Sequence, residues 1–138
     1  MAVMTVDERA AFLAEARVGV LAVGREGSAP LAVPIWYDYS PGGEVLLWTD
    51  RESVKYRAIQ AAGQLSVSVQ QESQPYRYVT VSGPVTATEL PTEQQALRIA
   101  ARYLPAPGAA AFVADTLSET SVLVRVRPEK WLSADQGK

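Results

Sequence analysis

The sequence predicts a mainly β fold in which about six strands form a small antiparallel barrel and helices lie outside it. Short β-rich runs follow one another between residues 18 and 90, and turn signals separate them at close spacing. The first half of the chain does not alternate strands with helices, which argues against a parallel doubly wound sheet. A chain of 138 residues with 48% hydrophobic content has the size of one domain with one core.

The chain begins with a helix signal followed by a hairpin signal. Thr5 and Glu8 have the spacing of a capping box, and apolar residues then recur at helical intervals, so we expect a helix over residues 6–16. Residues 18–23 and 29–39 are two β-rich runs joined by a turn that contains Gly24 and Gly27. These runs predict the first two strands of the sheet.

A third strand and a short helix are expected next. Pro41, Gly42 and Gly43 break the chain before an apolar strand at residues 45–49. Ser53 is suited to cap a helix of about two to three turns, and Gly63 stands where a left-handed C-terminal cap is wanted.

The second half predicts three further strands and a helical insertion. Residues 65–69 and 76–90 are strand-like, with a bend or bulge at Gly83–Pro84. A helix is expected from Thr92 to Tyr103, ended by Pro105 and Pro107, and a shorter one at residues 109–117. A last strand at residues 121–127 is expected to precede a polar tail.

Composition excludes several classes of function. The chain has neither cysteine nor histidine, so it lacks disulfides, the commonest zinc and haem ligands and the base of a Ser-His-Asp hydrolase. A net charge of −2 and scattered arginines give no attraction to nucleic acid. Apolar runs fall short of the roughly 20 residues that span a bilayer, and residues 7–9 are charged where a signal peptide would become apolar. We therefore expect a cytoplasmic protein without a metal, membrane or nucleic-acid site.

One segment has the features of an anion site. Residues 49–57 join a strand to a helix start, where free N–H groups and the helix dipole favour a negative charge. Ser53 and Lys55 lie in this first turn, Arg51 precedes it, and Arg57 falls on a different face of the helix from Lys55. The alternative interpretation is a solvated, charged helix start.

Aromatic residues on neighbouring predicted strands suggest a pocket for a flat ring. Trp36 and Trp48 would supply apolar faces, and Tyr37, Tyr76 and Tyr78 would add hydroxyls. The alternative is ordinary packing in the core and at its rim. The glycines have the wrong spacing for a P-loop or a dinucleotide-binding loop.

Five segments, taken in order, resemble the pyridoxamine-phosphate-oxidase-like family and its short branch of coenzyme F420-dependent reductases. The resemblance extends from about residue 5 to Trp131 and implies a six-stranded antiparallel split β-barrel of the FMN-binding type. The segments are Val20–Val23, Val33–Tyr37, Leu46–Thr49, Ser53–Lys55 and Tyr78–Gly83.

The resemblance also implies which residues bind the cofactor. In the family, a Thr or Ser that ends the third strand and a Ser-Arg-Lys-like turn hold the phosphate, which corresponds to Thr49 and Ser53–Lys55. The middle arginine is missing here, and Arg51 or Arg57 is expected to replace its charge. A glutamine of the oxidases aligns with Tyr78. Together with the residues along the flavin ring, the expected set is Val33, Pro34, Ile35, Trp36, Trp48, Thr49, Arg51, Ser53, Lys55, Arg57 and Tyr78.

The resemblance implies an oxidoreductase in which reduced coenzyme F420 gives hydride to a small organic acceptor. FMN is the alternative cofactor, and a non-catalytic flavin or deazaflavin carrier is the alternative function. It further implies a homodimer with the cofactor between subunits. True pyridoxamine-phosphate oxidases use an Arg-x-His motif near the C-terminus, and haem-degrading members use histidine, so the absence of histidine argues against both. No side chain with an unperturbed pKa near 7 is present, and we assign no catalytic residue.

Overall fold

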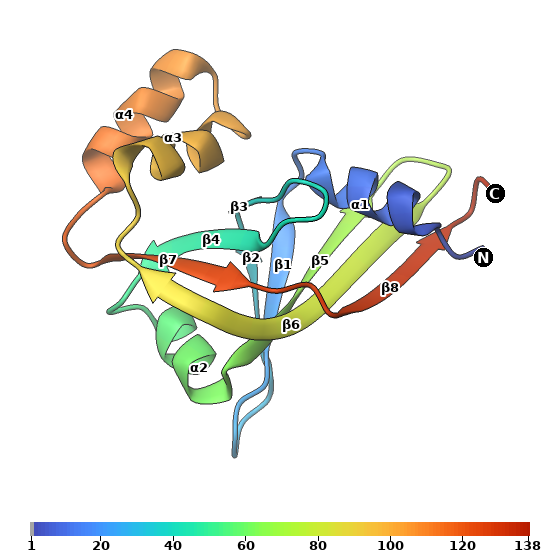
Figure 1. The fold of residues 1–138 in the computed structure, drawn as a ribbon, viewed down its shortest axis with the longest axis horizontal. Coiled ribbons are helices and arrows are strands. Elements are labelled where there is room, and N and C mark those ends of the chain that lie inside the picture. The colour runs from blue at the N-terminus through green and yellow to red at the C-terminus, as the bar shows by residue number, and fades with distance from the viewer. Residues whose placement is uncertain (1) are drawn as a thin grey trace.

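The structure, a computed structural model, describes residues 2–138. These residues form a strongly curved antiparallel sheet with four helices around it (Figure 1). The elements in chain order are α1 (Val6–Ala14), β1 (Gly19–Val23), β2 (Leu31–Ile35), β3 (Tyr37–Asp38), β4 (Val45–Asp50), α2 (Val54–Ala62), β5 (Gln64–Gln71), β6 (Arg77–Glu89), α3 (Glu93–Ala101), α4 (Ala106–Thr116), β7 (Ser121–Val126) and β8 (Lys130–Asp135).

The long strand β6 gives the sheet its barrel-like curvature. The strand order is β2-β1-β5-β6-β7-β4-β3, and β8 also pairs with β6. The first part of β6 pairs with β5 and β8, its second part pairs with β7, and the register shifts between Val85 and Ala87. A bend or bulge was expected at Gly83–Pro84, but these two residues continue the regular pairing with β5, and the irregularity lies just after them, between Val85 and Ala87. The prediction of a mainly β, antiparallel fold is confirmed.

The prediction of six strands was too low, because residues 2–138 form eight. The run predicted at residues 29–39 is interrupted at Trp36 and forms two strands, β2 and β3, which pair with different neighbours. The expected polar tail forms β8, which pairs with β6 over Arg77–Ser82. Its composition is mixed, so its burial depends on a partner strand that is distant in sequence.

The helix signals were largely correct. Thr5 and Glu8 form the expected capping box, although α1 ends at Ala14 and not at residue 16. Ser53 caps α2 by accepting from the Tyr56 N–H, and Gly63 adopts the left-handed conformation with φ 69°. Pro105 and Pro107 act differently from the prediction: Pro105 is the N-cap of α4, and the helix starts at Ala106. Pro107 lies in the first turn of α4, where proline is favoured because its fixed φ suits the helix and its missing N–H would have no helical partner.

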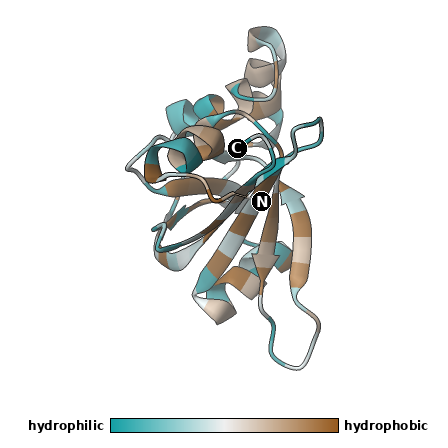
Figure 2. Cartoon of the chain, turned by 90° about the vertical axis from the view of Figure 1, so that its right-hand side faces the viewer, coloured by the Kyte–Doolittle hydropathy of each residue, from teal (hydrophilic) through white to brown (hydrophobic). Residues whose placement is uncertain are grey.

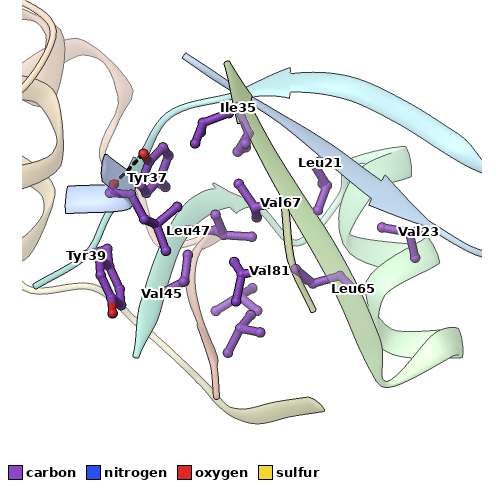
Figure 3. Close-up of a cluster of buried hydrophobic side chains, with 14 of the residues drawn as sticks. Leu21, Val23, Ile35, Tyr37, Tyr39, Val45, Leu47, Leu65, Val67 and Val81 are labelled. Carbon is purple, nitrogen blue, oxygen red and sulfur yellow. Dashed lines mark hydrogen bonds between the residues drawn. The ribbon is translucent and has the colours of Figure 1, made fainter. Parts of the chain in front are cut away.

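The main core lies inside the curved sheet (Figure 3). Inward-facing residues alternate with outward-facing ones along β1, β5 and β6, so the core is built from every second residue. Tyr37 is fully buried, and its hydroxyl donates to the Leu13 carbonyl at 2.6 Å, which ties α1 to the barrel. Figure 2 shows the same alternation as brown and pale residues along the strands.

Helices α3 and α4 form a separate pair that projects from the barrel between β6 and β7 (Figure 1). Ala96, Ala100, Ala109 and Val113 make a small core between them. Within residues 2–138, no helix is both long enough and apolar enough to cross a bilayer.

Gly83 is a position where the fold requires glycine. A Cβ added there would lie 1.7 Å from the Arg127 carbonyl oxygen, which is backbone and cannot rotate away. We expect Gly83→Ala to lower the free energy of unfolding by about 1–3 kcal/mol or more, measured by urea denaturation. Gly24→Ala is the matched control, because its added Cβ would meet no atom within 4 Å, and it should change stability by less than about 0.5 kcal/mol. Equal effects of the two substitutions would contradict this account of Gly83.

Candidate functional site

The site is built around the corner at Trp36, where the chain passes from one part of the sheet to the other. β2 ends at Ile35 on β1, and β3 starts at Tyr37 on β4. Strands that switch sheets in this way leave backbone groups outside the ladder. Here the Tyr37 N–H donates to the Tyr103 hydroxyl at 3.2 Å, and that hydroxyl lies 2.9 Å from the Arg17 carbonyl, to which it donates. The end of α3 thus supplies the hydrogen bonds that the corner lacks.

A buried carboxylate fixes α3 against the same corner. Asp38 is 6% exposed and lies 2.8 Å from Arg98 Nε and 3.6 Å from an Arg102 guanidinium nitrogen. Arg102 also donates to the Ala14 carbonyl at 3.0 Å. A buried charge that loses its partner is strongly destabilising, so these contacts hold α3 at one position on β3.

The rings of Trp36, Phe112 and Trp48 form an aromatic wall that extends from the corner, and Tyr103 packs behind Trp36. Trp36 is stacked on Tyr103, with ring centroids 4.8 Å apart and planes 10° from parallel. Phe112 of α4 lies between the two tryptophans, 5.1 Å from Trp36 and 5.7 Å from Trp48. Such contacts are worth about 0.5–1.5 kcal/mol beyond area burial, so the wall is packed as a unit.

This wall faces a cavity of about 410 Å³ between the barrel and the α3–α4 pair. The volume lies within the range of small-molecule sites, roughly 300–1,000 Å³. One part of the lining is apolar and aromatic, and the other is polar. The lining residues are Val18, Pro34, Ile35, Trp36, Trp48, Thr49, Asp50, Ser53, Lys55, Ile99, Phe112, Thr116 and Ser121.

The polar end lies where β4 passes into α2. The Ser53 hydroxyl accepts from the Tyr56 N–H at 3.2 Å, donates to the Asp50 carbonyl at 2.6 Å and lies 3.3 Å from the Thr49 hydroxyl. The first N–H groups of a helix have no partner within it and favour an anion, as the helix dipole also does. Lys55 is half-buried here, and within residues 2–138 its side chain makes no ion pair and no hydrogen bond. The polar end therefore has a cation available for a ligand.

Asp50 brings a negative charge to the same end. One of its carboxylate oxygens accepts from the Glu52 N–H at 2.8 Å, and the other accepts from the Thr120 hydroxyl at 2.7 Å. The Glu52 N–H, then the Thr120 hydroxyl and the Arg51 charge, hold the pKa of Asp50 below its usual value. Asp50 is therefore ionised at neutral pH.

The cavity brings together seven of the residues expected from the sequence. They are Pro34, Ile35, Trp36, Trp48, Thr49, Ser53 and Lys55.

The other expected residues lie elsewhere. Val33 packs against the barrel core. Arg51 donates to the Glu119 carbonyl and Arg57 to the Glu52 carbonyl, so neither replaces the missing arginine at the cavity. Tyr78 lies on β6 in a different hollow.

Tyr37 was expected as a pocket hydroxyl, but it belongs to the core. Its side chain is fully buried, and this burial raises the pKa of Tyr37 well above its usual range. The contribution of α3 and α4 to the cavity was not predicted from the sequence. Phe112 carried only a weak signal, as a lone aromatic residue in an alanine-rich helix, and nothing in the sequence pairs it with Trp36 or Trp48.

A comparison with protein families identifies the fold. The model of the family described as pyridoxamine 5'-phosphate oxidase matches residues 5–131. The chain belongs to this family. The family membership and the split-barrel fold expected from the sequence are thereby confirmed. A search of the curated proteins finds no match.

Solved structures include several similar members of this fold. An F420 reductase is 26% identical with a TM-score of 0.71, over 88% of this chain and 94% of that one. A conserved hypothetical protein from Mycobacterium tuberculosis is 23% identical with a TM-score of 0.74, over 97% and 86%. An FAD-binding protein from Mesorhizobium loti is 21% identical with a TM-score of 0.68, over 97% and 96%. The last two similarities show the fold alone.

The Tyr103 hydroxyl should be a measurable source of stability. Tyr103→Phe keeps the ring that stacks on Trp36 but leaves the Tyr37 N–H without its acceptor. We expect the free energy of unfolding to fall by about 1–3 kcal/mol in urea denaturation. Tyr76→Phe is the control, since Tyr76 is 45% exposed and should be nearly neutral. If Tyr103→Phe is as stable as Tyr76→Phe, the corner does not depend on this hydroxyl.

Proposed function

We propose that this protein is an oxidoreductase that uses reduced coenzyme F420 to transfer hydride to a small organic acceptor. The observation that carries the proposal is a single cavity that joins an aromatic wall to a helix N-terminus with an available lysine. A flat ring suits the wall, and a phosphate suits Ser53 and Lys55. The likeness to an F420 reductase at 26% identity over most of both chains supports the same cofactor.

The residues of the cavity fit such a group in shape and chemistry. Pro34, Ile35 and Trp36 follow the end of β2 and the corner, so they offer an extended strip of backbone and side chains to one face of a ring. Trp48 and Phe112 close the apolar part against water. Thr49, Ser53 and Lys55 add polar groups at the other end, which is where a ribityl phosphate would lie.

Reduced coenzyme F420, when bound, supplies a hydride from C5 of its deazaflavin ring. The part of the chain lining the cavity binds and orients the ring and excludes water from its apolar face. Asp50 and Lys55 are the titratable side chains in this lining, and both lie at the polar end. Asp50 is ionised at neutral pH and holds no proton to give. Lys55 is assigned to the phosphate and not to the reacting part of the ring, so the proton that completes the reduced product comes from solvent.

We also propose that the protein is a homodimer, because one face of the sheet is covered with small and apolar side chains. In one row across the five neighbouring strands β2, β1, β5, β6 and β8, Val20 lies beside Pro34 and Ser68, and Thr80 follows beside Leu132. Val20 is 43% and Leu132 61% exposed. Two such faces can approach closely, and exposed apolar patches mark interaction surfaces.

A second copy on this face would complete the cavity. Pro34 belongs both to the row and to the cavity lining, so a partner would lie at the cavity mouth. Tyr78 lies on the same strand as Thr80, two residues away, and so on the same face. In the proposed dimer, this residue would face the cofactor of the other subunit, which accounts for its distance from the cavity of its own chain.

Lys55→Ala tests the function. The lost charge-assisted hydrogen bond should weaken F420 binding by roughly 10- to 150-fold in a calorimetric titration. The turnover number with saturating F420 should recover, since a phosphate contact is equally strong in ground and transition states. Lys138→Ala is the matched control, because Lys138 pairs with Glu8 at the surface.

Measurements of turnover and of cofactor affinity distinguish an F420-dependent reductase from a carrier and from an FMN-dependent reductase. Oxidation of reduced F420 with any of a panel of quinone, enone and tetrapyrrole acceptors is expected. Binding without turnover would indicate a carrier, and tighter binding of FMN than of F420 would indicate an FMN-dependent reductase. Wild-type affinity of Lys55→Ala for F420 would mean that the phosphate does not bind at this turn.

The dimer is tested by placing a charge on the proposed interface. The wild type should sediment as a dimer at micromolar concentration, and Val20→Lys should shift it to a monomer, because a buried charge without a partner is costly. Val6→Lys, at a 66% exposed position on α1, should leave the dimer intact. A monomeric wild type that binds F420 fully would refute the proposal.

A further inference from the structure

The polar end of the cavity has fewer positively charged side chains than the family's phosphate-binding turn, which has an arginine as well as a lysine. Arg51 and Arg57 donate to the carbonyls of Glu119 and Glu52 and do not line the cavity. Lys55 is the one cation among the described lining residues, and Asp50 is the one anion. The formal charges of these two side chains cancel.

The Asp50 carboxylate is held in place and is not free to turn away. Its two oxygens accept from different groups, the Glu52 N–H just before the N-cap of α2 and the Thr120 hydroxyl just before β7. These bonds connect the end of β4 to both neighbouring segments. Any anion that binds at Ser53 and Lys55 therefore meets a fixed negative charge as well as the lysine.

The type of phosphate decides how much this matters. A phosphomonoester carries about −1.5 to −2 charges at pH 7, whereas a phosphodiester carries one. The free energy needed to remove an ion from water rises steeply with its charge. A site in which one lysine and one aspartate cancel in charge offsets little of this free-energy cost. The dianion is therefore at a greater disadvantage than the diester at this end of the cavity.

We propose that Asp50 is a specificity-determining residue that makes the cavity select a phosphodiester cofactor over a phosphomonoester. Coenzyme F420 has a phosphodiester, and FMN has a monoester. The inference rests on the proposed function only in requiring that a flavin or deazaflavin binds in this cavity.

Asp50→Asn is the test, since asparagine keeps the shape and the acceptor for the Glu52 N–H. Calorimetric affinities are measured for riboflavin, FMN and F420. Removing one negative charge should tighten FMN binding by about 5- to 10-fold and F420 binding by only about 2- to 3-fold, as expected for one charge acting through partly solvated surroundings. Riboflavin has no phosphate, so its affinity should not change, which also shows that the variant cavity is intact.

Glu52→Gln is the matched control, because Glu52 is the neighbouring carboxylate and does not line the cavity. It should leave all three affinities near those of the wild type. Equal gains for FMN and riboflavin, or no gain for FMN, would overturn the role of Asp50 while leaving the proposed function intact. Failure of the wild type to bind any of the three compounds would overturn both.

Discussion

The corner at Trp36 is the constraint on which the rest of the site depends. A strand that crosses between the two parts of a curved sheet must give up ladder hydrogen bonds, and buried backbone groups without partners are costly. In this protein, the Tyr103 hydroxyl supplies the missing acceptor for Tyr37, and the ring of Tyr103 stacks on Trp36. The same contact fixes α3, which carries α4 and Phe112 to the cavity. The contacts of Tyr103 with Tyr37 and Trp36 thus contribute both to the stability of the fold and to the geometry of the site.

The parts of the fold that depend on local signals could be predicted from the sequence. The capping box of Thr5 and Glu8, the Ser53 cap and the left-handed Gly63 each act within a few residues. The break at Trp36 lies inside a continuous apolar run, and only the sheet around it decides where the strand turns. The strand at Lys130–Asp135 has mixed composition and forms because β6 lies beside it. Strand pairings between segments that are distant in the sequence cannot be predicted from the residue pattern of either segment alone.

The same division holds for the site. Its polar end lies within one strand-to-helix connection, so Thr49, Ser53 and Lys55 could be predicted together to lie there. The aromatic wall is assembled from the corner between β2 and β3, from β4 and from α4, and its third ring, Phe112, could not be assigned without the structure. Sequence spacing also could not show that Arg51 and Arg57 bond to backbone carbonyls. The resulting balance of one lysine and one aspartate is a property of the folded chain alone.

The most direct test of the account is a crystal structure of the protein with coenzyme F420. The account predicts that the deazaflavin ring lies against Pro34 and Trp36 and that its phosphate contacts Ser53 and Lys55. A second hollow, of about 650 Å³, lies between α1 and the segment before β8, where Arg9 stands over the Trp131 ring. A ring bound in that hollow, or a phosphate bound away from Lys55, would contradict the account.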